Sequence, residues 1–414
     1  MDIKRVVVLL ILLLLFFSET SLDTSLAIEK KSIHSIYLFR LGGLAITDWI
    51  IIFISTLVII FSFQKGFLHV GIMKPILTLF IIYLGIGFMY NLTVMWELKG
   101  YLYDAKVSLY LFVPYLALSM FCRKLVITSD LIFKISFLLV IGILLDAVYI
   151  GFFGDPEYEK QINMPLILKI VPIELLVGIF FFLNIGKRYS FLALVYEFFS
   201  SYNRANLGSI FYGSLSFYWI FFIKLRLNFN LKVTFMTLSY YLIIIGVPLL
   251  IMFVFSELIS LKKGGMELRR IEIFNFIENA QINFPIFIGK GLGATWYEVI
   301  APNISNVYSQ GHLIDKDINF IWHNTLAGSF YKFGVIGSFC LIFYLSFISV
   351  KLYQVSRAVK NDAGVFIAFS IPAFVMLNVN GPGELKGALL SSVLLFGANQ
   401  ILRQFSQPLS KFEK

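Results

Sequence analysis

The chain has 414 residues, of which 59% are hydrophobic and 14% charged, and its mean hydropathy is +0.85. A soluble domain of this size cannot hide so much apolar surface, so the composition excludes an ordinary soluble protein and makes the lipid bilayer the solvent. The formal net charge of +10 fits basic loops that orient a membrane protein, and we infer no nucleic-acid binding from it. Cys122 and Cys340 are the only cysteines, so no disulfide framework or CxxC metal site is available.

Apolar runs of helical length recur along the chain and predict an all-α, polytopic bundle of about twelve transmembrane helices. Several of these runs are shorter than the ~20 residues that a full span needs, so their boundaries are approximate. We expect residues 1–414 to form a single transmembrane domain. The runs lie at about 6–17, 44–63, 75–91, 108–121, 126–150, 165–185, 189–202, 206–223, 233–255, 323–350, 363–380 and 387–401.

Lysine and arginine indicate which side each connection faces. An even number of spans puts both termini on one side, and the cytoplasmic loops of membrane proteins are enriched in Lys and Arg. We expect cytoplasmic termini, because every stretch that would then lie inside carries a pair or more of basic residues. These stretches are 1–5, 64–74, 122–125, 186–188, 224–232, 351–362 and 402–414.

The first apolar run, 6–17, has two readings. Lys4 and Arg5 precede it and Ser25-Leu26-Ala27 follows, which is the pattern of a signal peptide with a small-residue cleavage site. The local pattern favours this and a retained span about equally, and the choice leaves the other spans unchanged.

One connection is much longer than the rest. Residues 256–322 lie between the ninth and tenth runs, on the outer side of the predicted topology. Long loops in compact proteins are functional or disordered. Disorder is disfavoured here, since Leu268, Ile271, Phe274 and Ile277 recur at helical spacing. We expect the loop to fold as a lid on the outer membrane surface.

Two groups of arginines lie on the predicted outer side. Arg204 is in a short hairpin between two apolar runs, where a lone Arg is most often an interfacial anchor. Its planar donor fork also suits phosphate, and Glu197, two helical turns earlier, offers an ion pair as a third alternative. Arg269 and Arg270 open the amphipathic segment of the long loop, and such a pair is ordinarily the solvated face of a surface helix. Together with Arg204 they would place positive charge from two distant segments on one side of the membrane, as an anionic lipid headgroup requires.

The sequence PIFIGKGLG places Gly289, Gly291 and Gly293 close together in the long loop. Such glycines let a backbone turn sharply or approach a ligand, but outside a strand–helix context they are a weak nucleotide signal, and we predict no dinucleotide site. His323 and Asn324 begin the tenth run directly after the loop. An interfacial His is most often an inert polar tip, although a neutral imidazole there can also take a proton from a sugar hydroxyl.

HNTLAGSFYKFGVIG resembles the signature of the O-antigen ligase and polymerase family, in which His-Asn at the start of a span is followed by Gly eleven and fourteen residues later. Here these glycines are Gly334 and Gly337. The order Arg270, Phe274, Pro285 and the glycine cluster is similar to the family's Arg-x3-aromatic…Pro…Gly-x-Gly run, and Arg204 resembles the family's Arg between two spans. The resemblance covers about 189–350, and the first half only through span count and Asp48.

Three features depart from the family pattern. Asn203 stands where Ser is common, the glycine cluster lies one residue further from Pro285, and Lys332 occupies a place that is often acidic. None of these departures removes a proposed functional group.

The resemblance implies a GT-C-like membrane bundle that transfers a glycan, with inversion and without a metal or cofactor, from an undecaprenyl-pyrophosphate donor. The acceptor would be a glycan or a lipid-linked glycan at the outer face of a bacterial inner membrane, with a chain-length regulator as a further partner. His323 would activate the acceptor hydroxyl, while Arg204 and Arg270 would stabilise the pyrophosphate. Arg269, Asn324, Gly291 and Gly293 would complete substrate binding.

Two other classes stay open. A metal-dependent glycosyltransferase would use acidic outer loops, such as Asp155 with Glu157 or Asp315 with Asp317. A lipid-glycan flippase or transporter would explain charged residues within apolar runs, which are costly unless each makes a buried contact or lines a polar cavity. These are Lys134, Asp146, Lys169, Glu174 and Lys332. Ligase, polymerase and transfer to a protein acceptor are equally compatible with the sequence.

Overall fold

A computed structural model gives the fold of the chain. It describes residues 3–20, 40–41, 44–65, 70–95, 98–125, 127–128, 130–131, 223–254, 274–279, 286–297, 299, 313–315, 318–319, 325–379 and 385–409. These residues are predominantly helical, in agreement with the predicted class. Most of the four apolar runs between 126 and 223 lies outside them, so the twelve-span count stays a prediction.

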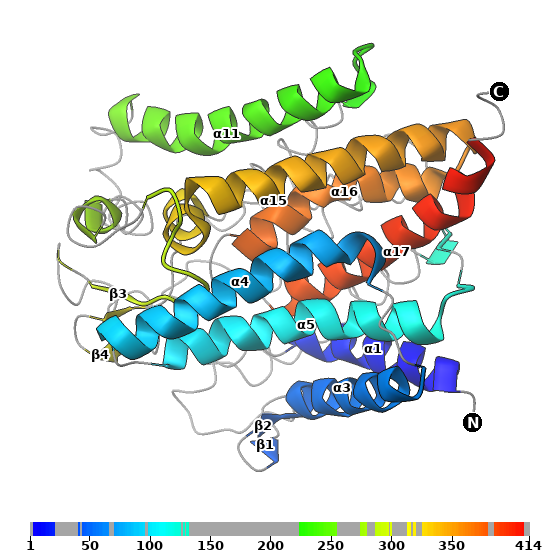
Figure 1. Ribbon diagram of the computed structural model, residues 1–414, viewed down its shortest axis with the longest axis horizontal. Helices are drawn as coiled ribbons and strands as arrows, with labels where there is room; N and C mark the ends of the chain where they lie inside the picture. Colours follow the sequence, from blue (N-terminus) through cyan, green and yellow to red (C-terminus); the bar gives the residue numbers. More distant parts are fainter. Residues whose placement is uncertain are drawn as a thin grey trace, which may run out of the picture.

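Eight of the predicted runs correspond to helices in the structure (Figure 1). The helices are α1 (Ile3–Thr20), α3 (Ile46–Lys65), α4 (Lys74–Tyr90), α5 (Lys99–Phe121), α11 (Phe229–Val254), α15 (Thr325–Ala358), α16 (Asp362–Val379) and α17 (Leu385–Leu409). Their boundaries lie within about four residues of the apolar runs, except that α5 begins about nine residues before its run and α15 and α17 end about eight residues after theirs. The early turns of α5 carry Asp104 and Lys106, which interrupt the apolar pattern without interrupting the helix.

Five strands of two or three residues add two small sheets. β1 (Arg40–Leu41) pairs antiparallel with β2 (Leu44–Ala45) just before α3. A second sheet has the order β3-β5-β4, formed by Trp296–Tyr297, Ile318–Asn319 and Leu313–Asp315. Strands this short have no usable alternation of polar and apolar residues, so the sequence did not predict them.

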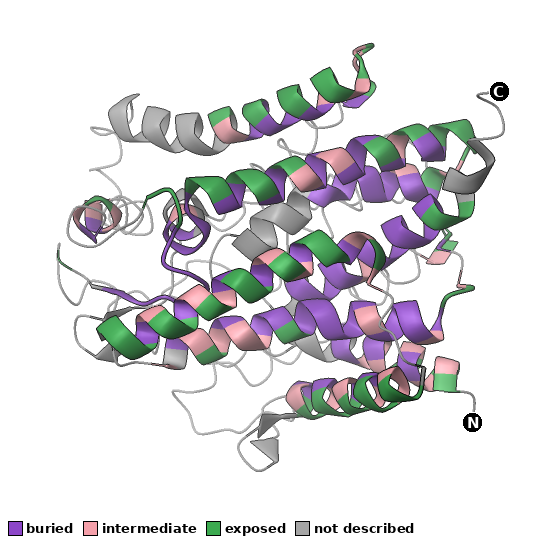
Figure 2. Cartoon of the chain, in the orientation of Figure 1, coloured by how far each residue is buried: buried purple, intermediate pink, exposed green. Residues whose placement is uncertain are grey.

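Three helical segments of the described chain are long and apolar enough to cross a membrane: Ile46–Gln64, Gly71–Val94 and Phe330–Ala358. The share of buried residues is 61% in the third segment but 22% and 28% in the first two. Figure 2 accordingly shows α3 and α4 with long exposed faces. These faces carry large apolar side chains such as Ile52, Phe53 and Ile81. Large exposed apolar faces are costly in water, so α3 and α4 are suited to contact lipid.

The core is formed where α15 packs against α11, α16 and α17, and where α5 packs against α3 and α17. α1 contributes Val7, Ile11 and Leu14 to this core and packs against α3, α5 and α17. Asp48, at the start of α3, accepts a hydrogen bond from Tyr110 at 2.7 Å and forms an ion pair with Lys106 at 2.8 Å, both on α5. These contacts tie the peripheral α3 to the core.

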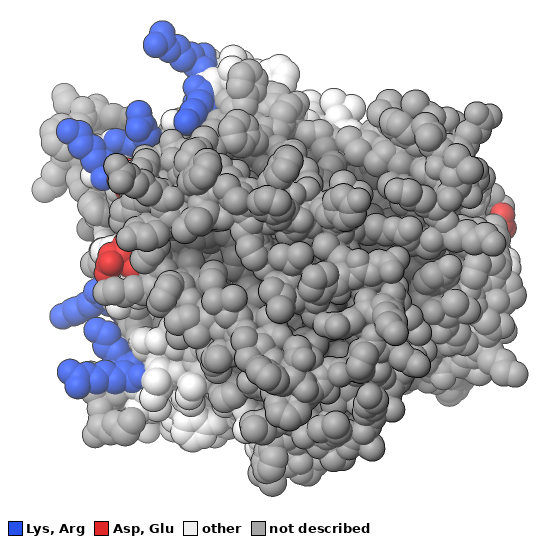
Figure 3. All heavy atoms as spheres, turned by 180° about the vertical axis from the view of Figure 1, so that it is seen from behind, with Lys and Arg blue, Asp and Glu red and all other residues white. Residues whose placement is uncertain are grey.

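Basic side chains gather at one end of the bundle. Both termini lie at one end, where α4, α11 and α16 also begin and α3, α5, α15 and α17 finish (Figure 1). Viewed from behind, the Lys and Arg side chains on the visible face gather at this end (Figure 3). The other end holds the end of α4, the beginnings of α5 and α15, and strands β3 and β4. The described parts of the predicted inside stretches thus lie together at the basic end.

Candidate functional site at the end opposite the basic residues

The structure places two of the predicted substrate-binding residues, Gly291 and Gly293. The predicted catalytic residue and the other substrate-binding residues lie outside the described part of the chain: His323, Asn324, Arg204, Arg269 and Arg270. Their convergence on one pocket therefore stays a prediction, and the site is built here from the described segments that adjoin them.

Residues 286–297, named here the glycine loop, thread between α4, α5 and α15. Gly289, Gly291 and Gly293 have φ values of +83°, +92° and +73°, a backbone region that residues other than glycine rarely adopt. These φ values allow the sharp backbone turns that the glycines of PIFIGKGLG make possible. They let the loop present both N–H groups and carbonyls to the helices beside it.

α15 is broken at Gly334, whose φ of 63° and ψ of −177° are not helical. A helix break leaves carbonyls unpaired before it and N–H groups unpaired after it. The glycine loop supplies partners for both sides of the break. The N–H groups of Lys290 and Gly291 donate to the carbonyls of Tyr331 and Lys332 at 2.8 and 2.9 Å.

On the other side of the break, the N–H groups of Val335 and Ile336 donate to the carbonyls of Ile286 and Phe287 at 3.0 and 3.1 Å. Figure 1 shows the beginning of α15 turned away from the line of its long part. The glycine loop thus bridges a short helical piece, 325–333, and a long piece, 335–358. The family-like glycine at 334 is where the helix changes direction.

The glycines also permit close backbone approach. A Cβ atom on Gly291 would collide with the backbone of Gly87 in α4, and one on Gly293 would collide with the backbone of Tyr101 in α5. Gly337 faces α4 in the same way, because a Cβ there would collide with the ring of Tyr83. The structure gives Gly291 and Gly293 a packing role, and their predicted contact with substrate stays a prediction.

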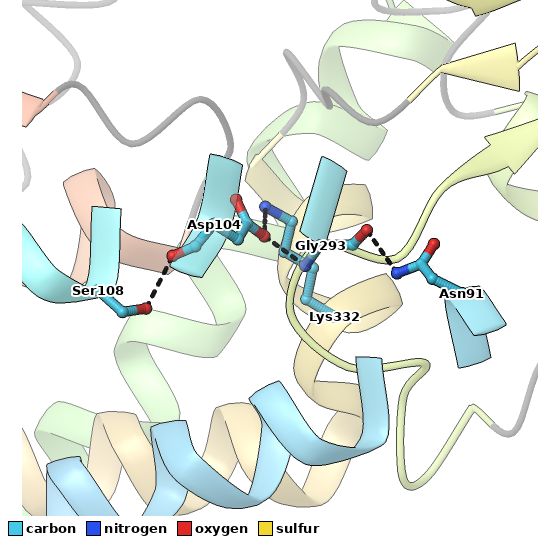
Figure 4. A network of polar contacts seen from close by, with 5 residues as sticks. All are labelled: Asn91, Asp104, Ser108, Gly293 and Lys332. Atoms are coloured by element: carbon cyan, nitrogen blue, oxygen red, sulfur yellow. Dashed lines mark hydrogen bonds and ion pairs between the residues drawn. The ribbon is translucent and has the colours of Figure 1, made fainter. Parts of the chain in front are cut away.

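A buried ion pair anchors the glycine loop to α5 and α15 (Figure 4). Lys332 Nζ lies 2.7 Å from Asp104 Oδ2, and the two side chains are only 4% and 8% exposed. The same carboxylate oxygen accepts a hydrogen bond from the Gly293 N–H at 2.6 Å. Lys332 therefore makes a buried contact, which is one of the two explanations, a buried contact or a polar cavity, that its place in an apolar run left open. The carboxylate of Asp104 compensates its charge.

Asn91, at the end of α4, holds the next part of the loop. Its amide nitrogen donates to the carbonyls of Gly87 and Gly293 at 2.8 and 2.9 Å, and its amide oxygen accepts from Thr295 at 3.2 Å. Tyr331 donates to the Thr295 carbonyl at 2.7 Å. With donors and acceptors matched inside the protein, this network rigidifies the loop.

Lys290 lies between two tyrosines. Its Nζ is 3.0 Å from the hydroxyl of Tyr90, 4.8 Å from the centroid of the Tyr90 ring and 5.0 Å from that of Tyr331. The residue is 3% exposed, and burial lowers the pKa of its amine to about 8. In the described part of the chain no carboxylate forms an ion pair with it. The aromatic faces and one phenol oxygen thus surround a cation at neutral pH.

Asp104 and Lys290 were not among the predicted site residues. Asp104 has a sequence signal, since it is an acidic residue in a helix that continues as an apolar run. Lys290 has no such signal: it stands between glycines in a loop, and only the fold brings Tyr90 and Tyr331 around it.

Among the described residues, no group of three or more His, Cys, Asp or Glu side chains could hold a metal ion. Of the acidic residues weighed as ligands, Asp315 is in β4, while Asp155, Glu157 and Asp317 lie outside the described chain. The metal-dependent alternative therefore stays a prediction.

No protein-family profile, curated protein or solved structure matches this chain. The resemblance to the O-antigen ligase and polymerase family consequently rests on the order and spacing of its motifs.

Proposed function

We propose that the protein is a metal-independent, inverting glycosyltransferase of the O-antigen ligase or polymerase type in a bacterial inner membrane. It would transfer a glycan from an undecaprenyl-pyrophosphate donor to an acceptor hydroxyl at the outer face. The observation that carries the proposal is the contact between the glycine loop and the broken start of α15. Two motifs of the family pattern, the glycine cluster within the long loop and Gly334 after it, here belong to one hydrogen-bonded unit.

The position of this unit supports the same proposal. It lies at the end of the bundle opposite the termini and the gathered Lys and Arg side chains. By the positive-inside rule the basic end faces the cytoplasm, so the unit faces the outer leaflet. A pyrophosphate-linked glycan that has been moved across the membrane would be met at that leaflet.

In the proposed reaction, His323 accepts the proton of the acceptor hydroxyl, and the oxygen attacks the anomeric carbon of the donor sugar. The bond from that carbon to the pyrophosphate oxygen breaks, and negative charge accumulates on the leaving group. Arg204 and Arg270 stabilise that charge with fixed guanidinium donors, which are effective in a poorly hydrated site and need no metal.

The buried contact of Lys332 bears on the transporter alternative. A charged residue in an apolar run is explained by a polar cavity or by a buried partner. Asp104 supplies that partner for Lys332, so no transport cavity is needed to account for it.

The proposal is tested with purified protein, a lipid-pyrophosphate glycan and an acceptor, with a new glycosidic product as the readout. We expect product in the presence of EDTA. A transporter would yield none, and activity abolished by EDTA and restored by a divalent cation would point to the metal-dependent class.

The proposed roles are tested by substitution. His323→Ala should abolish transfer while the protein stays folded and inserted, with His69→Ala, on the predicted inner side, as its control. Arg204→Ala and Arg270→Ala should each reduce kcat/KM by about 100-fold or more, as loss of an anion-stabilising donor does elsewhere. Arg→Lys should also be damaging because the bidentate geometry is lost. Wild-type kinetics in these variants would contradict the proposed roles. His323 would then be an inert polar side chain and the arginines would be interfacial anchors or solvated surface residues.

A further inference from the structure

The glycine loop has a feature that substrate binding does not explain. Four of its backbone hydrogen bonds span the break in α15, two to carbonyls before Gly334 and two from N–H groups after it. A single break with a glycine φ of 63° would otherwise act as a hinge, because glycine adopts many backbone conformations at little cost. The loop therefore holds the short piece 325–333 at one angle to the long piece 335–358.

Lys290 reinforces this bridge through both its backbone and its side chain. Its backbone N–H donates to the Tyr331 carbonyl, and its ammonium group lies against the rings of Tyr331 on the short piece and Tyr90 at the end of α4. The hydroxyl of Tyr90, 3.0 Å away, accepts its hydrogen bond. Lys290 thus links three segments: the glycine loop, α4 and the short piece.

We infer that Lys290 is a positioning residue, which locks the short helical piece of α15 against α4 and through it limits the positions open to His323. The kinetic part of the inference rests on the proposed function, and His323 itself lies outside the described residues. It precedes Thr325, the first residue of α15, by two positions, and two extended residues span at most about 7 Å. In the proposed site, the direction of the short piece would therefore limit how far the imidazole lies from the beginning of α15.

Releasing the Lys290 contacts should affect the rate of transfer. A catalytic group that is misplaced by about 1 Å costs roughly 100-fold in rate, even when the change is made far from the reacting atoms. Lys290 contacts neither substrate nor reacting atoms in this scheme. Releasing it should lower kcat while leaving donor affinity nearly unchanged, because the pyrophosphate is bound by other residues.

The first test is the effect of Lys290→Met on transfer kinetics. We expect kcat to fall about 10- to 100-fold and KM for the donor lipid to change less than about twofold. Lys290→Arg should keep most of the activity, since a guanidinium also binds aromatic faces. An unchanged kcat in Lys290→Met, or a loss confined to KM, would overturn the inference.

The second test measures the lock without relying on transfer. The Gly291 N–H donates to the Lys332 carbonyl on the short piece, whereas the Ile336 N–H, on the long piece, donates to the Phe287 carbonyl. Hydrogen–deuterium exchange in detergent micelles is compared between the wild-type protein and Lys290→Met. We expect faster exchange at Gly291 in Lys290→Met and unchanged exchange at Ile336.

Lys290→Arg is the matched control and should exchange at Gly291 as the wild-type protein does. Equal exchange at Gly291 with and without Lys290 would overturn the inference. If the wild-type protein transfers no glycan, the proposed function fails, whereas the exchange comparison still decides whether Lys290 locks the short piece.

Discussion

Two buried lysines lie at the glycine loop, one within it and one on α15 beside it, and the protein compensates their charges differently. Lys332, on α15, meets the carboxylate of Asp104 at 2.7 Å. Lys290, in the loop itself, meets the faces of Tyr90 and Tyr331 and one phenol oxygen. One cation is thus paired with a charge and the other only with neutral groups.

This difference predicts separate contributions of the two contacts to stability and to the position of the short helical piece. A buried ion pair is expensive to break, because removal of one partner strands the other without compensation. A lysine held by aromatic rings loses part of its hydration without gaining a full countercharge, which is why burial lowers the pKa of Lys290. We therefore expect the Lys332 contact to govern stability and the Lys290 contact to govern the position of the short helical piece.

The largest effect is expected from breaking the ion pair. Asp104→Asn keeps an acceptor for the Gly293 N–H but leaves Lys332 buried without its carboxylate, which should cost about 3–5 kcal/mol of unfolding free energy. Reversible denaturation in detergent micelles measures it. Adding Lys332→Met removes the stranded cation, so the double variant should recover most of the loss. An unchanged free energy of unfolding in the Asp104→Asn single variant would contradict the predicted cost of breaking the buried ion pair.

A somewhat smaller effect is expected from crowding the loop between the two lysines. Gly291→Ala should lose about 2–4 kcal/mol, since a side chain at φ +92° is strained and its Cβ collides with the backbone of Gly87. Gly85→Ala is the matched control on α4, because no other atom lies within 4 Å of its added Cβ. Thermal denaturation should separate the two variants, and equal melting temperatures would contradict the packing.

Removing the Lys290 side chain should have little effect on the free energy of unfolding near neutral pH. Lys290→Met loses the aromatic and hydroxyl contacts but also the burial of a charge, and these opposing effects should leave a change of about 1 kcal/mol or less. The same denaturation measurement at pH 7 checks this. A loss as large as that of Asp104→Asn would show that the two lysines are not compensated differently.

A pH dependence specific to Lys290 is also expected. Its pKa is lowered to about 8 in the folded protein from an ordinary value of 10.5, so the unfolded chain binds more protons between these values. The free energy of unfolding should therefore rise as the pH increases from about 8 to 10.5 and gain nothing from this group below that window. Lys290→Met should lack this increment when compared with the wild-type protein over the same range.

Much of the helical framework was predictable. Uninterrupted apolar runs located α3, α4 and α16 to within a few residues. Paired basic residues such as Arg123-Lys124 identified the stretches that share one end of the bundle. The beginning of α5 was missed because Asp104 and Lys106 resemble loop residues until their partners on other segments are known. The convergence of Arg204, Arg270 and His323 stays a prediction.

The amino-acid sequence by itself determined the class of the protein and the backbone freedom of its glycines, because both follow from side-chain chemistry that acts locally or against the solvent. Apolar composition demands lipid, and only glycine readily adopts the φ values found at 289, 291 and 293. Which partner each buried charge meets was decided by the tertiary structure. Asp104 and Lys332, or Lys290 and Tyr90, lie far apart along the chain, and only the packing of the glycine loop between helices removes water and brings each pair together.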